Sequence, residues 1–71
     1  MDKLEVQKVL GSKIRALRLD KGISQMELGA RIGKDDTSIS RLENGKVNPT
    51  YTYLLQIAEG LGISIAELLK D

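Results

Sequence analysis

The feature that most constrains this chain is a helix-start signal that recurs along its length. The capping-box pattern, a polar capping residue followed three positions later by Glu, occurs at residues 2–5, 24–27 and 64–67. Asp35-Asp36 and Pro49-Thr50 mark two further helix starts. The four segments that start at residues 2, 24, 35 and 49 are each followed by a glycine. Glycine ends helices readily because it tolerates the left-handed conformation. The closing glycines are Gly22, Gly33, Gly45 and Gly62.

Apolar residues within these segments recur at helical spacing. In the first segment, Val6, Leu10, Ile14 and Leu17 are expected to form one inward face. No stretch alternates β-branched and polar residues over a useful length, so no strand is expected. A chain of 71 residues is long enough for one small domain. The sequence therefore predicts an all-α fold, a compact five-helix domain that spans residues 1–71.

The composition excludes several classes of function. The chain contains neither cysteine nor histidine, which removes the thiolate nucleophile and the commonest general base and metal ligand. No glycine-rich phosphate loop or metal-ligand cluster is present either, so we expect no enzyme, no cofactor and no metal. No apolar run approaches the roughly 20 residues of a membrane span. Without a signal-peptide pattern, a cytoplasmic location at the nucleoid is expected.

Charge is distributed unevenly along the chain. The net charge is +1, but residues 1–21 carry six Lys/Arg against three Asp/Glu. Residues 22–46 carry four of each, and residues 47–71 carry one basic against three acidic side chains. This asymmetry is compatible with a basic face turned toward nucleic acid. It is equally compatible with ordinary scattered surface charge.

The second and third expected helices are short, and few residues separate them. A brief turn that contains glycine, here Gly33, between two short helices is typical of a helix-turn-helix. Gly29 is unusual inside a helix, where glycine is about 1 kcal/mol less favourable than alanine. A close helix–helix crossing would explain it, although any tight helical hairpin could make the same demand.

A longer set of residues makes the pattern specific. Together they resemble the Cro/repressor-type helix-turn-helix family, also called the XRE family, over roughly residues 10–69. The resemblance implies a lambda-repressor-like domain whose second and third helices form the helix-turn-helix. The matching residues are Arg15-Ala16-Leu17-Arg18, Gly22-Ile23-Ser24-Gln25, Glu27-Leu28, Gly33, Ile39-Ser40-Arg41-Leu42-Glu43-Asn44-Gly45, Pro49-Thr50, Leu54, Ile57-Ala58 and Leu61-Gly62-Ile63-Ser64.

By this resemblance, the segment at about residues 35–44 is the recognition helix in the major groove of DNA. Asp36, Thr37 and Arg41 match positions that contact base edges. Arg41 lies one helical turn after Thr37, on the same face. An arginine there can donate two hydrogen bonds to guanine, which discriminates by about 1–3 kcal/mol against a wrong base.

Four other residues match positions that contact the DNA backbone: Gln25, Ser38, Asn44 and Lys46. Gln25 offers a side-chain amide and a backbone N–H at a helix start, where phosphate oxygens are readily bound. Arg18 and Glu43 match a structural ion pair that links the first helix to the end of the recognition helix.

The two aspartates at the start of this helix invite two interpretations. Asp35 is expected to cap the helix, since its carboxylate can accept an N-terminal N–H. Asp36 either does the same or accepts a hydrogen bond from cytosine N4 in the major groove. In the second case it lowers affinity for every duplex while selecting among sequences, so modest affinity and strong salt dependence are expected.

The C-terminal region holds more apolar side chains than one small core needs, which favours a homodimer. The residues expected at this dimer interface are Ile63, Ile65, Leu68 and Leu69. Tyr51 and Tyr53 are interpreted as packing or surface residues rather than as platforms for stacked bases.

Two functions remain in competition. The first is a sequence-specific transcriptional regulator, a repressor or autoregulator of bacterial or phage type. It would bind double-stranded DNA at a near-palindromic operator as a homodimer, with recognition helices about 34 Å apart. The second is an antitoxin-like or other protein-binding module with the same fold. An apolar patch left exposed in the dimer would favour a protein partner.

Overall fold

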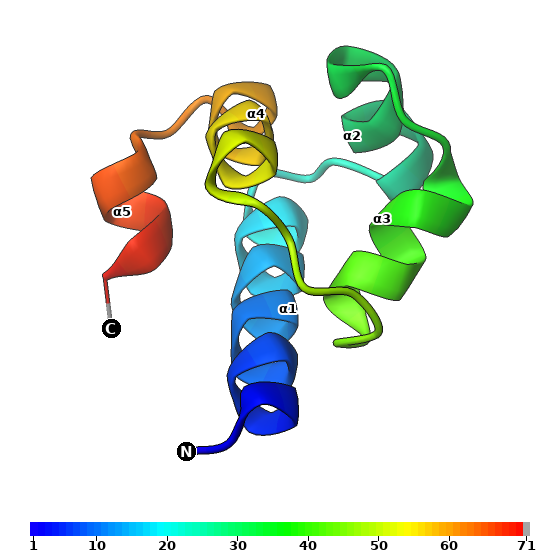
Figure 1. Ribbon diagram of the computed structural model, residues 1–71. Helices are drawn as coiled ribbons and strands as arrows, with labels where there is room; N and C mark the ends of the chain where they lie inside the picture. The colour runs from blue at the N-terminus through cyan, green and yellow to red at the C-terminus, as the bar shows by residue number, and fades with distance from the viewer. Residues whose placement is uncertain (71) are drawn as a thin grey trace.

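The computed structural model describes residues 1–70, which form five helices and no strand (Figure 1). This arrangement confirms the predicted all-α fold class. No helix in the described part of the chain is long and apolar enough to cross a membrane. The helices are α1 (Lys3–Asp20), α2 (Gln25–Ile32), α3 (Asp36–Glu43), α4 (Tyr51–Leu61) and α5 (Ile65–Leu69).

Every helix begins at a side chain that the sequence marks as a cap. Each capping residue has extended backbone, and its side-chain oxygen accepts the backbone N–H three residues further on. These bonds satisfy N–H groups that have no partner inside a helix. Because the caps and the four closing glycines are local signals, they predict where the helices begin and end. The caps are Asp2, Ser24, Asp35, Thr50 and Ser64.

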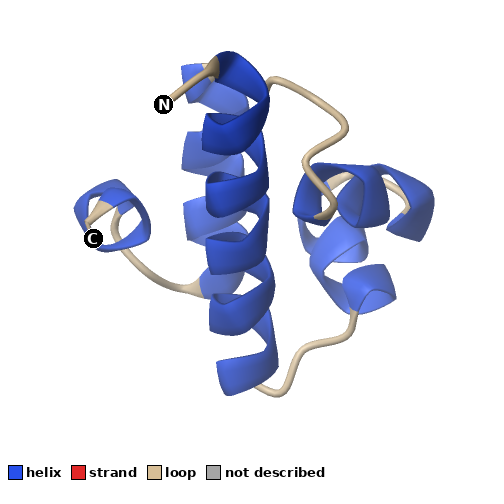
Figure 2. Cartoon of the chain, turned by 90° about the horizontal axis from the view of Figure 1, so that it is seen from below, coloured by secondary structure: helices blue, strands red, loops and turns tan. Residues whose placement is uncertain are grey.

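The core lies between α1, the α2–α3 pair and the C-terminal helices. Both views place α5 and the α2–α3 pair on opposite sides of α1 (Figures 1 and 2). Every helix contributes at least one apolar side chain to this core, and burying one large apolar side chain stabilises the fold by about 1.5–3 kcal/mol. The largest fully buried side chains are Ile14, Leu28, Ile39, Leu42, Ile57 and Leu68.

The buried face of α1 is rotated from the one predicted. Val6 was expected to point inward but is 49% exposed, and the buried residues include Gln7 and Gly11. A Cβ atom on Gly11 would lie 2.5 Å from the carbonyl oxygen of Leu42 in α3. Only glycine allows the end of α3 to come this close, so α1 presents a small and polar face to α3.

Candidate nucleic-acid interface

The turn between α2 and α3 is compact because glycines permit it. Gly33 ends α2 in the left-handed conformation, with φ 73° and ψ 30°, and Asp35 caps α3 two residues later. A Cβ atom on Gly29 would come within 2.5 Å of the carbonyl oxygen of Lys34. Of the two explanations for Gly29, the tight helical hairpin fits, because the atoms that approach it belong to the backbone of the turn and of the capping residue Asp35. A side chain at this position would displace the turn and with it the start of α3.

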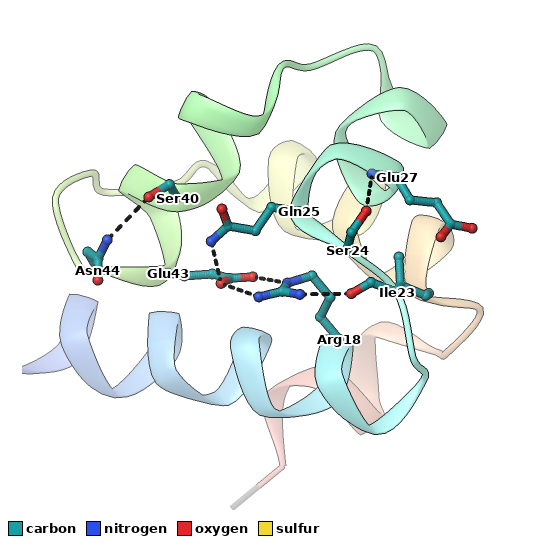
Figure 3. A network of polar contacts seen from close by, with 8 residues as sticks. All are labelled: Arg18, Ile23, Ser24, Gln25, Glu27, Ser40, Glu43 and Asn44. Carbon is teal, nitrogen blue, oxygen red and sulfur yellow. Dashed lines mark hydrogen bonds and ion pairs between the residues drawn. The ribbon is translucent and has the colours of Figure 1, made fainter.

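Arg18 and Glu43 form a buried ion pair between α1 and the end of α3 (Figure 3). Nε of Arg18 donates to Oε2 of Glu43 at 2.6 Å, and Nη2 donates to Oε1 at 3.0 Å. Nη1 donates to the carbonyl oxygen of Ile23 at 2.7 Å. Hydrogen bonding to Glu43 raises the pKa of Arg18 above its ordinary value, although burial partly opposes this. The guanidinium thus joins α1, the α1–α2 connection and α3, and the predicted pair is present.

Gln25, the first residue of α2, is attached to the same carboxylate. Its Nε2 donates to Oε1 of Glu43 at 3.1 Å, and this oxygen also accepts Nη2 of Arg18 (Figure 3). Glu43 therefore sets the direction of the Gln25 amide. One amide hydrogen and the backbone N–H at the helix start remain available for an anion.

The outward side of α3 carries the predicted base-contacting residues. Asp36, Thr37 and Arg41 are all exposed, while Ile39 and Leu42 point into the core. Within residues 1–70, none of the three exposed side chains takes part in a side-chain hydrogen bond or ion pair. Thr37 and Arg41 lie one turn apart on one accessible face, whereas Asp36, five residues before Arg41, lies about 140° from it around the helix. The contact of all three with bases stays a prediction.

The two aspartates have separate positions. Oδ1 of Asp35 accepts the backbone N–H of Ser38 at 2.7 Å. The Ser38 side chain, and then its backbone N–H, hold the pKa of Asp35 below its ordinary value of 3.8. Asp35 is thus the helix cap. Asp36 is the first helical residue and is exposed, which leaves its carboxylate free of the capping role.

The remaining predicted backbone-contacting residues lie around the ends and edges of α3. Nδ2 of the exposed Asn44 donates a long hydrogen bond, 3.4 Å, to Oγ of Ser40 (Figure 3). Lys46 is exposed just past Gly45. Ser38 precedes Glu43 by five residues, which places the two about 140° apart around the helix. Ser38 and Gln25 therefore flank opposite edges of α3.

Two polar contacts of α4 were not predicted. Nζ of Lys34 lies 5.2 Å from the centroid of the Tyr53 ring, and Nη1 of Arg31 donates to the carbonyl oxygen of Gly60 at 2.9 Å. Both contacts join residues far apart in sequence, so no local pattern indicates them. They anchor the helix-turn-helix to α4.

One residue of the predicted dimer interface is placed elsewhere. Leu68 is fully buried in the core of its own chain, so its assignment to the dimer interface is wrong. Its neighbour Leu69 is 46% exposed. Ile63 and Ile65 are partly buried against the core. Only these three retain surface that a second chain can contact.

Comparison with known proteins agrees with this geometry. The family model described as helix-turn-helix matches residues 14–68, which include all of α2 and α3. The chain belongs to the helix-turn-helix family of DNA-binding transcriptional regulators. The family is consistent with a binding protein and not an enzyme.

Three helix-turn-helix proteins illustrate the similarity. An uncharacterized HTH-type transcriptional regulator, y4dJ of Sinorhizobium fredii, is 39% identical over 66 residues, 93% of this chain and 86% of that protein. The restriction-modification controller protein C.AhdI of Aeromonas hydrophila superposes with a TM-score of 0.91 at 30% identity, covering 97% and 100% of the two chains. The P22 c2 repressor, solved with a synthetic operator, gives a TM-score of 0.74 at 34% identity over 86% and 92%.

Proposed function

We propose that this chain is a homodimeric repressor or autoregulator of transcription that binds a near-palindromic operator. In this proposal the segment 35–44, with α3 at its centre, lies in the major groove. Two copies of α3 stand about 34 Å apart, one turn of B-DNA. The similarity to a restriction-modification controller protein and to an operator-bound repressor supports this proposal.

The observation that carries the proposal is the division of α3 into two faces. Its inner face is fixed by apolar packing and by Glu43, while Asp36, Thr37 and Arg41 are exposed and form no side-chain hydrogen bond or ion pair within residues 1–70. Arg41 is proposed to read guanine through two hydrogen bonds, and Asp36 to accept from cytosine N4. Gln25, oriented by Glu43, is proposed to hold a phosphate and so to fix the register.

The deciding experiment is binding to the DNA upstream of the protein's own gene. Affinity is measured against a scrambled duplex over a salt series, and the stoichiometry is determined at saturation. We expect tighter binding upstream, two protomers per site and a steep loss of affinity with salt, because each neutralised phosphate releases counterions. Equal and feeble binding to both duplexes would contradict the proposal for this site.

Two variants separate specificity from affinity. Arg41→Ala is expected to relax sequence preference at one base pair, a loss of discrimination of about 1–3 kcal/mol. Gln25→Ala is expected to weaken all duplexes to a similar extent. Unchanged affinity and preference in Arg41→Ala would refute the placement of α3 in the groove.

The proposed dimer interface uses the exposed parts of Ile63, Ile65 and Leu69 together with Leu55. Leu55 is 42% exposed on α4, the helix that packs against α5. Leu55→Asp and Leu69→Asp are expected to shift the protein from dimer to monomer in sedimentation experiments and to weaken operator binding. Leu19→Asp is the matched control, because Leu19 is 56% exposed on α1.

A protein-binding function of the antitoxin-like kind has one observation in its favour. An apolar hollow of about 300 Å³ lies between α1 and α5, lined by side chains that include Val6, Val9 and Leu69. The protein-binding function replaces the operator-binding one on two results together. The chain shows no preference for upstream DNA, and Val6→Asp, while still folded, no longer captures a specific protein that the wild type captures. Preference for upstream DNA that Val6→Asp leaves intact favours the operator-binding function.

A further inference from the structure

A hollow of about 410 Å³, lined by both polar and apolar side chains, lies beside α3 on the edge away from Gln25. Lys34, Ser38 and Arg41 contribute to its lining on the side of the helix-turn-helix. The segment leading into α4 and the first turns of that helix contribute Asn48, Thr52 and other residues. Both charged side chains that line the hollow are basic, and the polar ones offer hydroxyl and amide donors. This combination suits an anion.

Lys34 is held at this hollow by an aromatic ring. Its Nζ lies 5.2 Å from the centroid of Tyr53, within the range of a cation–π interaction. Burial, and to a lesser degree the charge of Asp35, raises the pKa of Tyr53, so the phenol is neutral at physiological pH. The carboxylate of Asp35, the nearest acid in sequence, is engaged with the N–H of Ser38. The cation–π contact therefore directs the ammonium toward α4, although, after the hydrogen bonds from Ser38, its charge also lowers the pKa of the neighbouring Asp35, whose carboxylate opposes an anion here.

We propose that this hollow binds a backbone phosphate of the operator, with Lys34 as its cation and the hydroxyls of Ser38 and Thr52 as further donors. The proposal rests on the proposed operator-binding function. A helix in the major groove has one phosphate strand on either side. Gln25 lies at one edge of α3 and Lys34 at the other, so the two residues hold opposite strands. Lys34 thereby fixes the rotation of α3 within the groove.

The first test compares Lys34→Gln with the wild type on operator and scrambled duplexes from 50 to 200 mM salt. Each lost phosphate contact makes the slope of log affinity against log salt shallower by about 0.9, so we expect this change per protomer on both duplexes. The ratio of wild-type affinity to Lys34→Gln affinity should then fall by about 3.5-fold per protomer as salt rises fourfold. Lys70→Gln removes the same charge beyond α5. An equal effect in both variants, or none in Lys34→Gln, overturns the proposal.

Substitutions of Tyr53 provide a second test, which asks whether its aromatic ring positions Lys34. Tyr53→Phe keeps the aromatic face and is expected to bind like the wild type, whereas Tyr53→Leu is expected to lose affinity in the same direction as Lys34→Gln. Adding Tyr53→Leu to Lys34→Gln should then cause little further loss. Circular dichroism establishes that each variant is folded. Full affinity in a folded Tyr53→Leu protein shows that the ring does not position Lys34 and overturns its assigned role.

The third test locates the phosphate. Operators carrying one neutral methylphosphonate at a time are titrated with the wild type and with Lys34→Gln. One position in each half-site is expected to weaken the wild type more than the variant, which retains the hydroxyls of Ser38 and Thr52; equal sensitivity of both proteins at every position overturns the proposal. Binding of inorganic phosphate at Lys34 without DNA, at constant ionic strength, would instead assign the hollow to a free anion. A wild type that prefers no duplex overturns the proposed function as well, which distinguishes the two failures.

Discussion

Around Glu43 the helices meet through hydrogen bonds, whereas around Leu68 they meet through apolar side chains. Glu43 accepts bonds from Arg18 and Gln25, and so connects three helices through one carboxylate. Leu68 is fully buried among carbon atoms of the core. Hydrogen bonds have strict geometry, but a buried ion pair adds little net stability over an apolar replacement. Apolar burial is strongly stabilising but non-directional. The first region therefore sets orientation, and the second supplies stability.

The largest expected effect comes from breaking the ion pair on one side. Glu43→Ala leaves the Arg18 guanidinium buried without its carboxylate, so the free energy of unfolding should fall by about 3–5 kcal/mol. Urea unfolding at pH 7 measures this loss. An unchanged melting temperature would refute the structural role of the pair.

Replacing both partners sharpens the comparison. The double variant Arg18→Met with Glu43→Leu removes the buried charges together, and its stability should fall less than that of Glu43→Ala, although the carbonyl oxygen of Ile23 loses its donor. Operator affinity should nevertheless fall, because Gln25 loses the acceptor that orients its amide. Full affinity in this folded variant would show that the carboxylate does not position Gln25.

The apolar region is tested by Leu68→Ala. Truncating a fully buried leucine leaves a cavity, so the free energy of unfolding should fall by about 2–5 kcal/mol. Operator affinity, corrected for the folded fraction, should stay near the wild-type value. Leu19→Ala provides the control, because Leu19 is 56% exposed and such surface changes usually remain within about 0.5 kcal/mol. A specific loss of DNA binding in folded Leu68→Ala would contradict the division of roles.

A smaller effect is expected where α1 meets α3. Gly11→Ala introduces a Cβ atom that would lie 2.5 Å from the carbonyl oxygen of Leu42. The end of α3 must move, at a cost of about 1–3 kcal/mol as in other overpacked sites. Thermal unfolding and operator titration should both register this change. Ser12→Ala is the control, since Ser12 is exposed on the next position of α1.

The smallest effect concerns the cap of α3. Because the folded pKa of Asp35 lies below its ordinary value of 3.8, the carboxylate stabilises the fold above that pH and loses this contribution as pH falls through the folded pKa. Asp35→Asn should therefore flatten the acid side of a melting-temperature profile. Asp36→Asn, one residue along, is the matched control, because the Asp36 carboxylate does not cap the helix. Matching slopes in wild type and Asp35→Asn would contradict the contribution of the cap.

Local signals in the sequence predicted the helices well, whereas burial was predicted only in part. Caps and closing glycines act through the adjacent backbone, so Ser24 or Gly33 can be interpreted without knowledge of the fold. The inward face of α1 escaped prediction because its members Gln7 and Gly11 are not apolar. Leu68 and Leu69 are adjacent and chemically identical, so only tertiary packing distinguishes the buried one from the exposed one.

The residues of the candidate site were likewise predicted only in part. The resemblance located Arg18, Glu43 and the outer face of α3. It offered no information on Lys34, whose partner Tyr53 lies 19 positions away in another helix. The sharing of Glu43 between Arg18 and Gln25 was likewise absent from the pattern, because it depends on how three helices converge.

The outer face of α3 has a consequence for how such a protein can change its target. Asp36, Thr37 and Arg41 support neither the core nor the cap of their helix. They can therefore be exchanged without rebuilding the domain, and new combinations can be selected for new DNA sequences on an unaltered framework. Arg18, Gln25 and Glu43 cannot be exchanged singly in this way, because they share the hydrogen bonds of one carboxylate. A substitution at one of them requires a compensating substitution at the others. Related proteins that bind different DNA sequences should accordingly differ mainly at positions 36, 37 and 41.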